Sequence, residues 1–157
     1  VFVLSVMSGE QDRIDIAQAA AQQLQEIGIN CTVDIPAQID WGGQMAYLIG
    51  WGSPFDADDH TYKVFGTDKG ANYSSYSNAL VDQYLIEARE SADPAVRAEA
   101  YDKFQEELAK DPAFTFICYI DANYVANSSI QGISADTVMG HHGVGIFWNV
   151  ADWTIGN

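Results

Sequence analysis

The chain has 157 residues, of which 48% are hydrophobic, so it can bury one sizeable core and is expected to form a single domain. Its 22 acidic and 7 basic residues give a formal net charge of −15, which argues against nucleic acids and anionic membrane surfaces as partners. No apolar run approaches the ~18 residues of a membrane-spanning helix. Val1 opens directly in an apolar segment, which is typical of a mature chain or a fragment.

The N-terminal residues 1–35 have the pattern of a β-α-β unit. Residues 1–6 (VFVLSV) are rich in β-branched and aromatic side chains, which predicts a central strand. From Asp12, apolar residues recur at helical spacing up to Ile27, and Gly28 is expected to end that helix. Residues 29–35 alternate between apolar and polar, which predicts a second strand with one face more exposed.

Residues 45–66 change from a buried strand to a loop rich in carboxylates. The apolar run 45–49 (MAYLI) predicts a strand buried on both faces, and Gly50-Trp51-Gly52 ends it. The two glycines allow the backbone to approach whatever lies opposite, while the indole supplies a flat apolar contact and one N–H donor. Because three aspartates follow closely, we expect this strand end to be a binding surface rather than core.

The second half of the chain predicts packing helices and a fourth strand. After a Gly-, Ser-, Asn- and Tyr-rich loop, Asn78 is expected to cap one helix and Asp93-Pro94 to begin another. Residues 114–120 (FTFICYI) predict a buried strand, and shorter strand-like pieces follow at 124–126 and 146–148. The prediction is a three-layer α/β domain with helices on both faces of one mostly parallel sheet, which contains residues 1–6, 29–35, 45–49 and 114–120.

Several short segments, in their order and spacing, resemble a known family. The first helix ends in Gln-Leu-Gln-Glu-Ile-Gly-Ile, the Gly-Trp strand end precedes an Asp-rich loop, and Asn-Tyr-Ser-Ser-Tyr-Ser-Asn precedes Val81-Asp82. A last passage runs through Arg97, Tyr101, Gln105 and Asp111-Pro112. Over nearly its whole length the chain resembles the family 5 solute-binding proteins of ABC importers, which carry oligopeptides, dipeptides and sometimes nickel.

The resemblance implies one lobe of a periplasmic-binding-protein-like type II fold. Family members have two lobes that close around the solute, and this chain is too short for both, so residues 1–157 are expected to be the second, C-terminal lobe alone. The implied function is non-catalytic capture of a solute, expected to be a peptide, without a cofactor. The implied partners are that solute, the membrane subunits of the importer and the first lobe. The implied location is extracytoplasmic, in the periplasm or lipid-anchored on the outer face of the bacterial cell membrane.

The candidate ligand-binding residues lie after predicted strands or in segments that match the family. In peptide-binding relatives, the peptide backbone pairs with the strand end that corresponds to Gly50-Trp51-Gly52 here, which agrees with strand addition as a mode of peptide recognition. An aspartate three residues after the tryptophan binds the amino terminus of the peptide in those relatives, and this sequence has Pro54 there. The full set of candidates is Ser8, Gly9, Gly50, Trp51, Gly52, Ser53, Asp56, Asp58, Asn72 and Tyr73.

Each of these candidates also has a structural interpretation. Asp56 or Asp58 either replaces the missing amine anchor or belongs to a structural loop signature after the Gly-Trp pair. Asn72 and Tyr73 either bind the ligand or satisfy the backbone of their own loop. The indole of Trp51 is expected to line the cleft, because flanking glycines have little use around a core residue.

Other functions and ligands stay open. Nickel or another small solute is an alternative to a peptide for the same fold. A carboxylate-based hydrolase is an alternative from a different class, since neighbouring aspartates offer acid and base groups, although no nucleophile motif accompanies them.

No protein-bound metal is expected, because the adjacent histidines His141-His142 would point to opposite faces of an extended segment. Cys31 and Cys118 both lie in apolar runs that predict buried thiols, and the sequence does not decide whether they pair.

Overall fold

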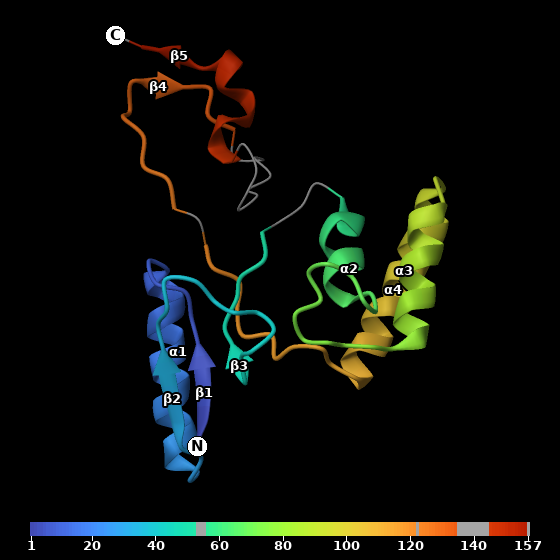
Figure 1. Ribbon diagram of the computed structural model, residues 1–157. Coiled ribbons are helices and arrows are strands. Elements are labelled where there is room, and N and C mark those ends of the chain that lie inside the picture. The colour runs from blue at the N-terminus through green and yellow to red at the C-terminus, as the bar shows by residue number, and fades with distance from the viewer. Residues whose placement is uncertain (53–55, 122, 135–144, 157) are drawn as a thin grey trace. The chain divides into compact units, whose positions relative to one another are not determined.

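The computed structural model describes residues 1–52, 56–121, 123–134 and 145–156 (Figure 1). Its contacts divide the chain into two compact units, Val1–Gly50 and Trp51–Asn157. Each unit has a hydrophobic cluster of its own. The single-lobe interpretation of residues 1–157 therefore stays a prediction. In the part of the chain that is described, no helix has the length and apolar content needed to cross a bilayer.

The N-terminal unit is a β-α-β arrangement with a third parallel strand. It contains β1 (Phe2–Ser5), α1 (Gln11–Glu26), β2 (Cys31–Asp34) and β3 (Ala46–Tyr47). The strand order is β2-β1-β3, and both pairings are parallel, with Phe2 opposite Cys31 and Leu4 opposite Ala46. The predicted α/β class, the parallel sheet and the central position of the first strand are confirmed. The strand expected at 45–49 to be buried on both faces is instead the short β3 at one edge of this sheet, and Met45 is 70% exposed.

Helix α1 packs against this sheet through a small apolar core. Val6, Ile14 and Ala17 are buried together, and Leu4, Val33 and Leu48 pack against them. The helix ends where expected, because Gly28 has a φ of +83°, a left-handed conformation that glycine adopts without steric cost. These contacts fix the end of β1 and the residues that follow β3 at the same edge of the sheet.

The C-terminal unit contains three packed helices: α2 (Ala57–Phe65), α3 (Ala79–Glu90) and α4 (Pro94–Lys110). As predicted, the Asn78 side chain accepts hydrogen bonds from the backbone N–H groups of Leu80 and Val81, and Asp93 caps α4 directly before Pro94. Helices α3 and α4 share a core of Val81, Leu85, Phe104 and Leu108.

The prediction of a buried strand at 114–120 is wrong for this structure. No residue of this segment pairs in a sheet within the described chain, and Phe116 is 69% exposed while Tyr119 is fully exposed. A run of this composition favours an extended backbone, but a strand forms only where a neighbour supplies hydrogen-bonding partners. The thiol of Cys118 is consequently exposed rather than buried, and both cysteines are free.

The last part of the chain contains short elements. Strands β4 (Ile130–Gln131) and β5 (Thr154–Ile155) pair antiparallel, and the 3₁₀ helix η1 (Gly145–Asp152) precedes β5. The strand-like pieces expected at 124–126 and 146–148 are not strands, since the first is irregular and the second lies within η1. Apolar tripeptides are too short for periodicity to separate strand from helix.

Candidate functional site

The turn after β1 presents backbone at the carboxyl edge of the parallel sheet. Ser8 and Gly9 are both exposed, and the backbone N–H of Ser8 donates a 2.9 Å hydrogen bond to the carbonyl of Pro36. Gly9 has a φ of +90°, so the turn depends on a residue without a Cβ atom. In α/β sheets, ligands are commonly held at this edge. Ligand contact by Ser8 and Gly9 stays a prediction.

Gly50 lies at the end of the N-terminal unit, and its open face is occupied by Arg13. A Cβ atom built on Gly50 would lie 2.5 Å from Nη2 and 2.8 Å from Nε of Arg13. The glycine therefore permits close approach, as the sequence suggested, and the group that approaches is the guanidinium of α1. Nothing in the local sequence pattern identified Arg13 beforehand, because the contact joins positions 13 and 50.

Trp51 begins the C-terminal unit as part of an aromatic cluster with His60 and Tyr73. The indole and the Tyr73 ring stack with 6.2 Å between centroids and 16° between planes, and the His60 ring is tilted against the indole at 5.7 Å. The side chain of Trp51 is 38% exposed. One part of the indole is thus supported by protein while another is open to a ligand. Ser53 and Pro54, which follow Gly52, lie outside the described residues.

Asp56 forms hydrogen bonds with two helices, α2 and α4. As the N-cap of α2, its carboxylate accepts from the backbone N–H of Asp58 at 2.8 Å. Nη2 of Arg97, on α4, donates to both carboxylate oxygens at 2.7 and 2.8 Å. The backbone hydrogen bond and then the guanidinium lower the pKa of Asp56. This geometry favours the structural role of Asp56, so its contact with ligand is a prediction that lacks structural support.

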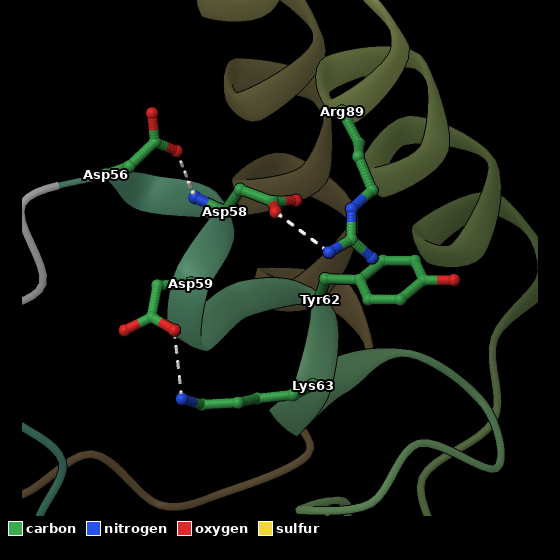
Figure 2. A pocket seen from close by; sticks show the side chains of 6 residues that line it. All are labelled: Asp56, Asp58, Asp59, Tyr62, Lys63 and Arg89. Carbon is green, nitrogen blue, oxygen red and sulfur yellow. Dashed lines mark hydrogen bonds and ion pairs between the residues drawn. The ribbon is translucent and has the colours of Figure 1, made fainter.

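Asp58 pairs with Arg89 at the rim of a shallow pocket of about 340 Å³ (Figure 2). The ion pair joins α2 to α3 at 3.2 Å, and the Arg89 guanidinium lies 3.9 Å from the centre of the Tyr62 ring. Asp59 and Lys63, which also line this pocket, form a second ion pair at 3.1 Å, one turn apart on α2 (Figure 2). The three aspartates that line this pocket are each paired with a cation, on α2, α3 or α4. These ion pairs join the three helices, which favours a structural role for the aspartates.

Asn72 uses its side-chain amide within its own loop. The amide nitrogen donates to the carbonyls of Gly66 and Tyr76 at 2.9 and 2.7 Å. The amide oxygen accepts from the Tyr76 backbone N–H at 3.0 Å and from the Ser74 hydroxyl at 3.2 Å. All four hydrogen-bonding capacities of the amide are therefore used. Asn72 thus shapes the loop that holds Tyr73 against Trp51. Because its amide is fully used within the loop, ligand contact by Asn72 is a weaker prediction than ligand contact by Tyr73.

The described residues form neither a cluster of metal ligands nor the acid–base pair of a carboxylate hydrolase. No group of three or more potential metal ligands occurs among them. His141-His142 lies outside the described residues. A glycosidase-like pair needs one carboxyl group with a raised pKa to act as the acid, whereas the pKa of Asp56 is lowered and Asp58 is paired with Arg89.

Two curated proteins are similar to this chain over most of its length. No family model matches the sequence. Protein XP55 of Streptomyces lividans is 32% identical over 85% of this chain and 26% of that protein. Oligopeptide-binding protein AppA of Bacillus subtilis is 25% identical over 97% of this chain and 28% of that protein. The chain thus spans about a quarter of the length of these curated relatives.

Solved structures extend the comparison to the fold. The crystal structure of NikZ from Campylobacter jejuni in complex with Ni(L-His) matches 98% of this chain and 33% of its own, with 34% identity and a TM-score of 0.83. The structure of AppA in complex with a nonapeptide matches 99% of this chain and 32% of its own, with 22% identity and a TM-score of 0.70. These neighbours are family 5 solute-binding proteins, which confirms the resemblance inferred from the sequence.

Proposed function

We propose, from the relationship of this chain to family 5 solute-binding proteins, that it is the second lobe of a protein that captures a solute for an ABC importer without catalysing a reaction. The observation that carries this proposal is the similarity to NikZ over 98% of the chain, at a TM-score of 0.83. The chain spans a third of that protein. The activity of the whole protein, its location outside the cytoplasmic membrane and its importer partners are therefore all parts of the proposal.

A peptide is the first solute class that we propose. The solute would lie between this lobe and the first lobe, with its backbone along the strand end at Gly50-Trp51-Gly52. Main-chain pairing of this kind is indifferent to peptide sequence and leaves side-chain pockets to supply preference. Trp51 favours peptide binding, because its indole stacks on Tyr73 and is partly exposed. It therefore offers a rigid apolar face to a side chain or a peptide plane of the solute.

A chelated nickel ion is the second candidate, because one specific observation favours it. NikZ, solved with Ni(L-His), is more similar to this chain in both identity and TM-score than AppA, which was solved with a nonapeptide. In this alternative the metal would arrive already bound by small molecules, so the protein would not need a cluster of metal ligands. A chelated nickel ion is therefore compatible with the described residues, among which no group of three or more potential metal ligands occurs.

The proposal is tested by identifying what the full-length protein carries. The protein is purified under native conditions, the bound material is released by acid, and its composition is determined by mass spectrometry together with elemental analysis for nickel. Recovery of peptides supports the first solute class, and recovery of nickel with small-molecule ligands supports the second. A sugar, or nothing that binds again on titration, contradicts both.

A second assay separates binding from catalysis. The same protein is incubated with a panel of chromogenic esters, glycosides and peptides, and no turnover is expected. Turnover that disappears in Asp56→Ala or Asp58→Ala would replace solute capture by a carboxylate-based hydrolase.

A further inference from the structure

Residues 116–120, called the apolar segment below, are exposed to water although none of them is charged. More than half of each large apolar side chain in the segment is exposed: Phe116, Ile117, Tyr119 and Ile120. The thiol of Cys118, between them, is exposed as well. A contiguous run of exposed apolar side chains is typical of a surface that another folded body covers.

The chain directly before the apolar segment is packed on the helices of the C-terminal unit. Ala113 packs against the core that α3 and α4 share. The ring of Phe114 meets the ring of Phe65, on α2, edge to face with 5.9 Å between centroids. The exposure therefore begins where contact with the helices ends, two residues after a packed aromatic ring.

The composition of the apolar segment matches a strand that is buried on both faces. In a strand, successive side chains point to opposite faces of the sheet. Phe116, Cys118 and Ile120 would share one face, and Ile117 and Tyr119 the other, so both faces would be apolar. Strands of this kind lie inside sheets that are covered on both sides. The sheet of β1, β2 and β3 does not include the segment, so the sheet that suits it belongs to another body.

These requirements favour a folded domain over a second copy of this chain. Two copies of the segment could pair edge to edge, but both faces of that pair would stay in water. Each copy would also carry a formal net charge of −15, which opposes association. The chain matches NikZ over 98% of its own length but spans only 33% of that protein. Relatives of this chain therefore contain enough additional protein to supply a covered sheet.

We propose that the apolar segment forms a strand within a sheet of the first lobe, and that it is the surface through which this chain is held to that lobe. This inference rests on the proposed function, in which residues 1–157 are one lobe of a two-lobe protein, and it names the residues that meet the other lobe. The contact combines main-chain hydrogen bonds with burial of apolar side chains. Because it belongs to the folded protein, it is present with and without solute.

The first test measures protection of the Cys118 thiol in the native full-length protein. The protein is reacted with N-ethylmaleimide over a time course and digested, and mass spectrometry follows the peptides that contain Cys118 and Cys31. The same protein unfolded in urea gives the rate of a fully accessible thiol. We expect Cys118 to react at least about a hundredfold more slowly in the native protein, because a strand inside a sheet must open locally before its thiol is reached.

Cys31 is the internal reference for this measurement. It is half-buried in β2, whereas Cys118 is exposed in this chain. Exposure in this chain alone would therefore make Cys118 the faster of the two thiols. The proposed strand reverses that order in the full-length protein.

Lysine substitutions test the same surface without a chemical label. Ile117→Lys and Tyr119→Lys should lower the midpoint of thermal unfolding of the full-length protein, or prevent folding, because each would bury a charge without a partner. Leu80→Lys, at another partly exposed apolar position on α3, is the matched control, and Tyr119→Phe keeps the aromatic ring. We expect both controls to unfold within about 2 °C of the wild type, as is usual for surface and conservative changes.

The inference is overturned if Cys118 reacts faster than Cys31 in the native full-length protein, or if both segment lysine variants are as stable as Leu80→Lys. Protection that rises with protein concentration, together with a dimer in sedimentation, would assign the segment to a second copy instead. Protection that appears only with bound solute would also contradict a strand that belongs to the folded protein. The proposed function fails separately: a full-length protein that protects Cys118 but binds neither peptide nor nickel complex keeps this contact and contradicts solute capture.

Discussion

Replacement of Trp51 by alanine separates the binding role of the aromatic cluster from a packing role. The surroundings of the indole give the expected losses of stability and of solute affinity. The indole is 38% exposed and has two aromatic neighbours, Tyr73 and His60. Each such pair contributes about 0.5–1.5 kcal/mol beyond burial, so we expect loss of the two pairs to lower the free energy of unfolding by about 1–3 kcal/mol. A fully buried tryptophan would cost about 3–5 kcal/mol. Loss of a central aromatic contact with solute should weaken binding by about 1–3 kcal/mol.

The assay combines urea unfolding of this chain with calorimetry of the full-length protein on its co-purified solute. Trp51→Phe is the control, because it keeps an aromatic ring against Tyr73 while it removes the indole N–H and leaves a smaller ring. A modest loss of stability together with a loss of affinity supports the binding role. If Trp51→Ala lowers stability as much as the loss of a core residue and leaves affinity unchanged, the indole has only a packing role. The assignment of Trp51 to the binding site would then be wrong.

Three further predictions concern the scaffold of the C-terminal unit. Leu85→Ala, in the shared core of α3 and α4, should lower the free energy of unfolding by about 2–5 kcal/mol, while Leu80→Ala on the same helix, 45% exposed, should cost well under half of that in the same urea titration. Asn78→Ala removes the cap of α3 and should cost about 1 kcal/mol, with Asn78→Asp retaining most of the stability; equal loss in both variants would contradict capping as the cause. The pKa of Asp56 is lowered from 3.8, so its ionised form contributes stability that is present above pH 3.8 and is lost as the pH falls through the lowered pKa. Asp56→Asn should therefore unfold with a weaker dependence on pH below 3.8 than the wild type, and an unchanged acid profile would refute the lowered pKa that the Asp58 backbone N–H and Arg97 give to this carboxyl group.

The sequence by itself determined the elements that depend on neighbours in the chain. The end of α1 at Gly28 and the starts of α3 and α4 at Asn78 and Asp93-Pro94 were all predicted, because capping and left-handed backbone involve residues within one helical turn. The parallel β-α-β unit was also predicted, since an apolar strand, an amphipathic helix and a second strand in succession have few ways to pack.

Only the tertiary structure decided which distant residues meet. The run 114–120 has the composition of a buried strand, yet a strand also needs a partner, and composition carries no information about that. The sequence left Asp56 open between ligand contact and a structural role, and its pairing with Arg97, 41 residues away, favours the structural role. The contact between Arg13 and Gly50 is of the same kind, because a glycine indicates that something approaches closely, but only the packing of α1 against the sheet shows that it is a guanidinium.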